Sequence, residues 1–281
     1  MGDNTTSIEV TQKDVKELVE LASCSTDGLG ASSSFVKDAA VCWRYLTAAA
    51  TTSLPGPANT LPYLMRTARW RDECAVESIL ADRTLGDHES RLRRVLLYDL
   101  SVDQCGRPLM IERPGAWDVD ALSREVTEAE DQMVRAHVHV LERIRLAVDS
   151  GRGDGRGDRR AVLVFDMAGM GLRLLGSRTI LRAFSRMSKL DADHYPETVR
   201  SIFVVNAPRA FSAAWAVAQP FVAEGTQKKV SVFSWAAAAA AHEALSSCCG
   251  AACLPCELGG TRSKAPPYAW DALGSEDVPP K

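Results

Sequence analysis

The sequence between residues 194 and 208 is HYPETVRSIFVVNAP. A polar turn around Pro196 leads into the apolar run Ile202–Val205, and the stretch closes on Pro208. An unbroken β-branched run bounded by turn residues is typical of a buried strand, and a proline directly after it fits the first turn of a helix. The stretch therefore predicts a loop, a buried strand and the start of a helix.

Similar apolar runs lie on both sides of this stretch, at Ala161–Phe165 and Val230–Phe233, and helical segments separate them. Such runs are typical of parallel strands that helices bury on both faces. Further upstream, Val95–Leu100 and Pro108–Ile111 are predicted strands joined by the turn Asp103–Gly106. The pattern predicts an α/β fold with a mixed, mostly parallel sheet and crossover helices.

The first part of the chain has a different periodicity. Apolar residues recur at helical spacing in four segments, near residues 8–22, 35–46, 61–70 and 72–81. We therefore expect residues 1–88 to form a small N-terminal helical bundle, residues 89–262 to form the α/β domain, and residues 263–281 to be a C-terminal tail.

Composition narrows the class of protein. The 281 residues carry a net charge of −3 at pH 7, and 46% of them are hydrophobic, so a globular core is expected and a nucleic-acid partner is not. No apolar run reaches about 18 residues, and the polar start does not resemble a secretory signal, which together favour a soluble cytoplasmic protein. The first residues fit a loose myristoylation pattern at Gly2, and an unmodified polar tail is the alternative.

The segment after Pro208 is apolar nearly all round from residue 209 to residue 224. A helix without a polar face must be buried in the core or must cover another apolar object, such as a lipid-filled cavity. Beyond it, Thr226, Lys228 and Lys229 offer a hydroxyl and two ammonium groups that could hold a phosphate, although a lysine pair is commonly a solvated surface.

Other chemistries find little support. Gly169-Met170-Gly171 could begin a dinucleotide-binding turn, but Leu174 replaces its third glycine. Asp166 and His194 could form an acid–base pair, yet no Gly-x-Ser-x-Gly elbow is present, so we do not expect an enzyme. The cysteine cluster at residues 248–256 could hold zinc or be acylated, but it lacks a second ligand pair, so no metal site is expected.

Taken in order, these segments resemble the CRAL-TRIO family, in its Sec-fourteen-like phosphatidylinositol-transfer branch. The motifs that match are Leu64–Trp70, Asp103–Pro108, Asp166 with Gly169, Tyr195–Thr198, Asn206–Pro208, Pro220-Phe221, Thr226 with Lys229, and Leu254–Gly260. The likeness covers about residues 35–262 and implies a CRAL-TRIO lipid-binding fold.

The resemblance implies a lipid pocket floored by the sheet and closed by a gate helix near residues 209–224, which carries Phe211, Trp215 and Phe221. It also places an inositol-phospholipid head group at Glu197, Thr226, Lys229 and Arg69. Thr226 would donate to the phosphate, Lys229 would neutralise it, and Glu197 would orient Lys229. One departure lies beside Arg69, where the second arginine of the family's N-terminal helix is Ala68.

A second departure concerns choline lipids. The family's exchange proteins hold that head group with a hydroxyl-rich stretch, and this chain has Gly171, Leu172 and Arg173 there, so choline-lipid binding is not expected. Residues 170–173 instead resemble the animal branch, which carries tocopherol, squalene or other apolar lipids alongside phosphoinositide.

The resemblance therefore implies a protein that binds a phosphatidylinositol-type lipid and transfers or presents it between membranes. Its expected partners are phospholipid, a membrane surface visited transiently from the cytoplasm, and a phosphoinositide kinase; the lipid is its ligand, and no cofactor is expected. The alternatives are a carrier of another lipophile, such as tocopherol, squalene or a sterol-like molecule, and a lipid-sensing regulatory module without transfer activity.

Overall fold

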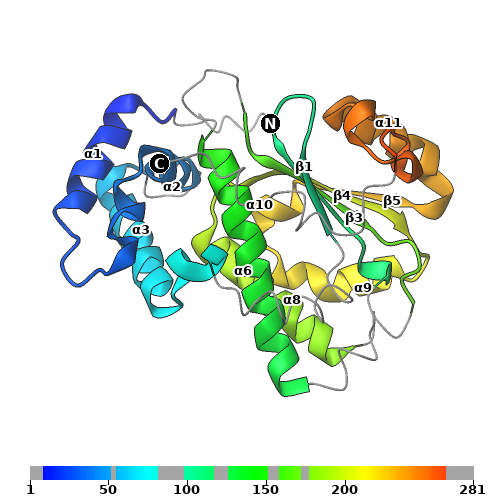
Figure 1. Ribbon diagram of the computed structural model, residues 1–281, viewed down its shortest axis with the longest axis horizontal. Coiled ribbons are helices and arrows are strands. Elements are labelled where there is room, and N and C mark those ends of the chain that lie inside the picture. The colour runs from blue at the N-terminus through cyan, green and yellow to red at the C-terminus, as the bar shows by residue number, and fades with distance from the viewer. Residues whose placement is uncertain are drawn as a thin grey trace, which may run out of the picture.

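The computed structural model describes residues 9–51, 55–81, 98–116, 126–150, 158–171 and 177–263 (Figure 1). The predicted boundary between residues 88 and 89 lies outside the described residues. So do Gly2, the choline-lipid positions Leu172 and Arg173, and all of the predicted tail except its first residue.

The centre of the fold is a sheet that has five strands within the described part of the chain. They are β1 Tyr98–Val102, β2 Pro108–Glu112, β3 Ala161–Asp166, β4 Val199–Ala207 and β5 Val230–Ser234, and they lie side by side in chain order. The pair β1–β2 is antiparallel, and the other three pairs are parallel. The predicted mixed, mostly parallel sheet is confirmed.

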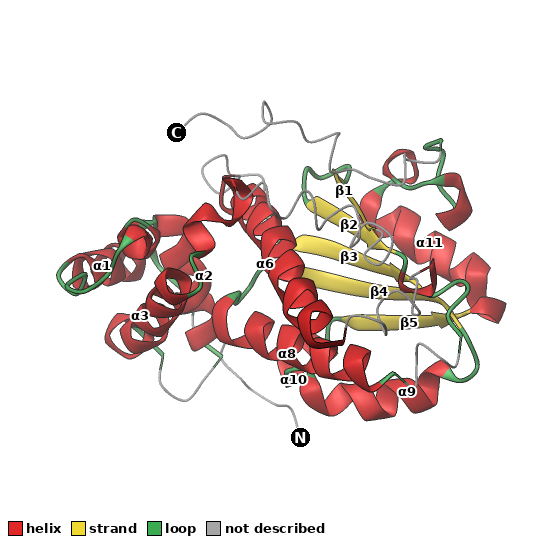
Figure 2. Cartoon of the chain, turned by 60° about the horizontal axis from the view of Figure 1, so that its bottom comes forward, coloured by secondary structure: helices red, strands yellow, loops and turns green. Residues whose placement is uncertain are grey.

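The order of the strands decides where the helices lie. Each parallel strand is added on the same side of the previous one, and right-handed crossovers then place all connecting helices on one face. This face carries α6 Val126–Ser150, α8 Arg178–His194, α9 Phe211–Ala218 and α10 Glu224–Gln227. The helix α11, Ala238–Cys249, covers the opposite face (Figure 2).

The region predicted as one gate helix over residues 209–224 is interrupted, so that expectation is wrong in its bounds. Helix α9 ends at Ala218, a 3-10 turn spans Gln219–Phe221, and α10 begins at Glu224. Pro220 lacks the N–H group that would continue the ladder of α-helical hydrogen bonds, so the chain turns there.

The N-terminal bundle consists of α1 Gln12–Ser23, α2 Ala39–Ala49 and α3 Pro57–Glu73. The two helices predicted near 61–70 and 72–81 are in fact α3, which runs across both, and a 3-10 helix over Val76–Ala81. Further 3-10 helices lie at Ala31–Ser33, Phe35–Lys37, Pro114–Ala116, Trp235–Ala237, Ala251–Cys253 and Cys256–Leu258.

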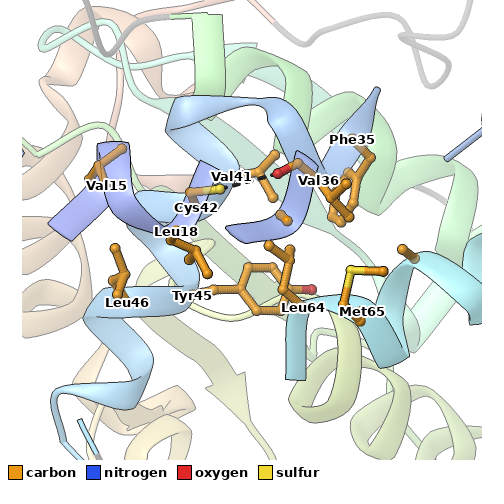
Figure 3. Close-up of a cluster of buried hydrophobic side chains, with 12 residues drawn as sticks. Val15, Leu18, Phe35, Val36, Val41, Cys42, Tyr45, Leu46, Leu64 and Met65 are labelled. Carbon is orange, nitrogen blue, oxygen red and sulfur yellow. Dashed lines mark hydrogen bonds between the residues drawn. The ribbon is translucent and has the colours of Figure 1, made fainter. Parts of the chain in front are cut away.

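The bundle has its own apolar core, separate from that of the sheet. Its side chains come from all three helices and from the connection between α1 and α2 (Figure 3). Leu18, Tyr45 and Leu64 are fully buried there, one from each helix. The bundle core and the core between the sheet and α11 are therefore two distinct clusters.

Candidate functional site

Three charged residues come together at the amino ends of the parallel strands. Arg160 directly precedes β3, Glu197 lies two residues before β4, and Lys229 directly precedes β5. The amino ends of neighbouring parallel strands meet at one edge of a sheet, so residues that are far apart in the sequence become neighbours there. The structure thus brings Glu197 and Lys229 together, as the resemblance implies, and adds Arg160 to them.

Glu197 lies between the two cations. Its Oε1 atom is 3.6 Å from Nζ of Lys229, and its other carboxylate oxygen accepts a hydrogen bond from Nη1 of Arg160. Nζ of Lys229 also donates to the carbonyl oxygen of Val199 at 2.9 Å, which fixes the ammonium group beside the start of β4. All three charged side chains are 18–28% exposed, so they are partly shielded yet still open to a ligand.

Two more residues complete this group. Oδ2 of Asp158 accepts from Nη2 of Arg160 and from Nη1 of Arg200, both at 2.7 Å. Partial burial acts against ionisation of Asp158, but hydrogen bonds from Arg160 prevail and hold the pKa of that carboxyl well below its usual range. We call Asp158, Arg160, Glu197, Arg200 and Lys229 the amino-end cluster. Its three cations outnumber its two carboxylates, so the cluster favours an anion.

The sequence analysis missed Asp158, Arg160 and Arg200. Nothing in a single sequence shows that Arg160 pairs with a residue 37 positions away. A signal was nevertheless present: Arg160 stands immediately before a predicted parallel strand, as Lys229 does, and residues at that position share an edge.

Glu197 is held in an unusual backbone conformation. Its φ of 50° is in the left-handed region, which a residue with a β-carbon enters at a cost of about 1 kcal/mol. Pro196 precedes it with a fixed φ, and the Thr198 hydroxyl donates to the carbonyl oxygen of Tyr195 at 3.0 Å, closing the turn. We call residues 195–198 the Glu197 turn.

The two remaining head-group candidates lie differently. Thr226 is half-buried in α10, and its carbonyl oxygen accepts from the Lys229 amide at 2.9 Å, so it is near the amino-end cluster. Arg69 is exposed on α3, and among the described contacts none joins it to Glu197, Thr226 or Lys229. The structure therefore groups three of the four candidates.

The two faces of the sheet are buried to different extents. Val162, Val164 and Phe203 are buried under α11. On the opposite face, five apolar side chains stay partly accessible: Leu163, Phe165, Ile202, Val230 and Val232. We call them the accessible sheet face. Two of them, Leu163 and Phe165 of β3, pack against a cluster that includes Val140 and Ile144 of α6, and they still remain partly accessible.

Strand β5 departs most from the expected burial on both faces, because Val232 is 46% exposed. Val232 pairs with Val204 and Val230 pairs with Ile202, so these β5 side chains point to the same face as the neighbouring β4 side chains. The accessible sheet face thus continues across three parallel strands and offers an apolar floor.

Helix α9 covers the end of this floor. Phe211 is buried against Met167 and Val204, and the half-buried Trp215 ring stacks on Phe211 with a centroid distance of 6.3 Å. The outward side of the segment is apolar as well, since Val217 is 55% exposed and Phe221 is 45% exposed. Of the three predicted gate residues, Phe211 and Trp215 point inward and Phe221 points outward.

The described residues include no group of three or more His, Cys, Asp or Glu side chains that could hold a metal ion. In the cysteine cluster, Cys249 is buried, Cys248 and Cys253 are half-buried, and Cys256 is exposed. No helix among the described residues is both long and apolar enough to cross a membrane.

The chain is similar to known proteins in sequence and in fold. Protein real-time of Anopheles gambiae is 28% identical over 200 residues, which cover 70% of this chain and 28% of that protein. Phosphatidylinositol/phosphatidylcholine transfer protein SFH13 of Arabidopsis thaliana is 31% identical over 199 residues, which cover 69% of this chain and 31% of that protein. The chain thus spans less than a third of the length of these curated relatives.

The crystal structure of Sfh5 matches with a TM-score of 0.54 at 15% sequence identity, over 80% of this chain and 82% of that one, a likeness of fold alone. The family model of the CRAL/TRIO domain matches residues 92–260, which is more than half of the chain and includes all five strands. The chain belongs to the CRAL/TRIO family.

Proposed function

We propose that this protein binds a phosphatidylinositol-type phospholipid and transfers or presents it between membranes. The head group would bind at the amino-end cluster, and the acyl chains would lie along the accessible sheet face beneath α9. Residues 1–88 would act as an N-terminal unit, residues 89–262 as the lipid-binding domain and residues 263–281 as a tail.

The observation that carries the proposal is the position of Glu197 between Arg160 and Lys229. In this arrangement, Lys229 and Arg160 would neutralise the phosphate diester, and Glu197 would accept hydrogen bonds from inositol hydroxyl groups while orienting Lys229. Thr226 would donate to the phosphate. Arg69 would require a movement of its side chain or of the lipid to take part.

The accessible sheet face supports the acyl-chain part of the proposal. Exposed aliphatic side chains on central strands cost free energy in water, roughly 25 cal/mol for each Å² of apolar surface, and a bound acyl chain would recover it. In the predicted gate region, residues 209–224, the exposed side chains include the apolar Val217 and Phe221. These side chains suit transient contact with a bilayer. The names of the plant relatives, phosphatidylinositol/phosphatidylcholine transfer proteins, agree with this ligand class.

The test is transfer of labelled phosphatidylinositol between liposomes by the purified protein and by Lys229→Ala. Loss of the cation should lower the transfer rate about tenfold, because a charge-assisted hydrogen bond to a phosphate contributes about 1.5 kcal/mol. Lys228→Ala is the matched control, since Lys228 is exposed and pairs with Glu224 at 2.8 Å. Equal rates for Lys229→Ala and wild type would reject the head-group assignment.

The same assay separates the neighbouring functions. Phosphatidylcholine should be transferred poorly, since Gly171 and Arg173 replace the hydroxyl-bearing residues of the family's exchange proteins. Transfer of tocopherol or squalene without phosphatidylinositol would identify a carrier of another lipophile. Stable binding of phosphatidylinositol without any transfer would identify a lipid-sensing module.

A further inference from the structure

The N-terminal bundle reaches the Glu197 turn through one buried arginine. Arg44 on α2 is completely buried, and its Nη1 atom donates a hydrogen bond to the carbonyl oxygen of Pro196 at 3.1 Å. Pro196 is adjacent to Glu197 in the chain. A side chain of the bundle thus contacts the backbone one residue before the carboxylate that lies between Arg160 and Lys229.

The Arg44 guanidinium is itself fixed. Its Nε and Nη2 atoms donate to the two carboxylate oxygens of Asp149 on α6, at 2.8 and 3.1 Å. A two-point bond of this kind sets both the position and the orientation of the guanidinium plane. The remaining nitrogen, Nη1, is then directed at Pro196 without rotational freedom.

Neighbouring residues of the same segment are also held from outside the sheet. The Tyr45 hydroxyl, again from α2, donates to the carbonyl oxygen of His194 at 2.9 Å. Figure 3 shows the Tyr45 ring among the core side chains of the bundle, so the hydroxyl is supported by a packed anchor. The Tyr195 hydroxyl donates to Glu142 on α6 at 2.7 Å, and Glu142 is bonded in turn by Arg71 of α3 at 2.7 Å.

The backbone conformation of Glu197 explains why the turn needs support from outside the sheet. The left-handed backbone of Glu197 is unfavourable by itself and persists only where the surroundings hold it. On one side the turn is held by the sheet, through β4. On the other side it is held by Arg44 at Pro196 and, through the preceding residue His194, by Tyr45. Without the second contact, the turn could relax toward an ordinary backbone conformation and swing the Glu197 carboxylate away from Lys229.

We propose that Arg44 and Tyr45 are positioning residues of the N-terminal bundle, which set the Glu197 carboxylate against Lys229 and so determine the affinity for an inositol-bearing anionic head group. Arg44 and Tyr45 act on the head group without touching it, and they leave the binding of acyl chains unchanged. The ligand class rests on the function proposed above.

The test uses two conservative changes and a matched control. Arg44→Lys keeps a buried cation beside Asp149, but the ammonium group lacks the planar fork that bonds both carboxylate oxygens and directs a separate nitrogen at Pro196. Tyr45→Phe removes only the hydroxyl. The control is Tyr63→Phe on α3, which removes a hydroxyl bonded to the carbonyl oxygen of Ala192 at 2.9 Å, also across the boundary between bundle and sheet but further from Glu197.

Three quantities are measured for each variant: affinity for phosphatidylinositol in liposomes, occupancy by a fluorescent fatty acid, and amide hydrogen exchange of residues 195–199. For Arg44→Lys we expect about tenfold weaker phosphatidylinositol binding, unchanged fatty-acid occupancy and faster exchange in the turn. Tyr45→Phe should change the same quantities less, and Tyr63→Phe should match wild type.

Each other outcome has a definite meaning. Wild-type phosphatidylinositol affinity in Arg44→Lys, with Lys229→Ala impaired, overturns the positioning role and leaves the proposed function standing. Equal loss of both ligands in Arg44→Lys shows a purely structural role and also overturns it. If wild type does not bind phosphatidylinositol, the proposed function fails, and unchanged hydrogen exchange in Arg44→Lys would then reject the positioning role separately.

Discussion

The indole ring of Trp70 stacks on the imidazole ring of His194, with centroids 4.0 Å apart and planes inclined by 5°. This contact joins α3 of the bundle to the last residue of α8, and Nδ1 of the same imidazole lies 3.1 Å from the Thr67 hydroxyl. Burial in this contact lowers the pKa of His194 to about 4. We therefore expect acid to weaken the boundary between bundle and sheet.

The first prediction is that stability falls as the pH falls from 6.5 to 4. Unfolded His194 takes up a proton near its ordinary pKa of 6.5, whereas the folded protein resists protonation until about pH 4, so acid favours unfolding in this window. The loss should be about 1–2 kcal/mol after allowing for solvent screening of a half-exposed group.

In His194→Phe, which keeps an aromatic ring but cannot be protonated, thermal unfolding midpoints should depend less on pH between 6.5 and 4. The midpoint is followed by circular dichroism in the same buffers for both proteins. An identical pH dependence in variant and wild type would show that another group carries the acid sensitivity.

The second prediction concerns Glu112, whose side chain alternates with Ile111 and therefore lies on the face of the sheet opposite α11. Burial raises the pKa of its carboxyl to about 7. A raised pKa means that the stability present at low pH is lost as the pH rises through 7. Glu112→Gln should thus be more stable than wild type at pH 8, by about 2 kcal/mol, and should have no advantage at pH 4.5. Urea unfolding at both pH values checks this, and a destabilised variant at pH 8 would contradict it.

The third prediction compares an outward-facing with an inward-facing side chain of the predicted gate region, residues 209–224. Phe221→Ser should slow phosphatidylinositol exchange with liposomes and leave the thermal midpoint nearly unchanged, because the ring is 45% exposed. Phe211→Ala should instead destabilise the protein by about 3 kcal/mol, since its ring is buried against Val204. Exchange and thermal unfolding are measured on both variants. Normal exchange in Phe221→Ser would remove the membrane role of the outward side.

The fourth prediction tests the buried ionic network between α3 and α6. Glu142 accepts hydrogen bonds from Arg71, Arg145 and Tyr195. Burial opposes its ionisation, but the bonds from Arg71 prevail and lower the pKa of Glu142 to about 2. Glu142→Gln would leave two buried arginines without this counter-charge and should cost about 3–5 kcal/mol.

The control for this change is Glu17→Gln, the same substitution at an exposed position of α1, which should stay within about 0.5 kcal/mol of wild type. Chemical denaturation gives both free energies of unfolding. A loss in Glu142→Gln no larger than in the control would mean that the network contributes little to stability.

The sheet was predictable because its signal is local. The runs Ala161–Phe165 and Val230–Phe233 are rich in valine and phenylalanine, with Ser231 as the one polar residue, and both are parallel strands in the structure. The gate segment was predicted as one helix because its apolar character is continuous, and the interruption at Pro220 was underestimated. Periodicity describes which face is apolar, whereas a single missing N–H group decides where a helix ends.

Only those residues of the candidate site that belong to a family motif could be predicted from the sequence. Glu197 and Lys229 followed from the family resemblance, and the structure places them together. Arg44 and Arg71 were not predicted at all, because an arginine in a helix is normally a surface residue and its burial depends on a carboxylate that is distant in the sequence. Such pairs are properties of the folded arrangement.

The buried arginines also limit how this chain can diverge. The charges of Arg71 and Glu142 neutralise each other, and their side chains are only 1% and 3% exposed to solvent. Losing either partner alone would leave an uncompensated charge in the interior, whereas replacing both by packed apolar residues removes both charges at once and leaves Arg145 paired with Asp149. Among descendants of this sequence, the two positions should therefore change as a pair. A chimera that takes its helical bundle from one relative and its sheet from another should fold only when both parents carry matching partners.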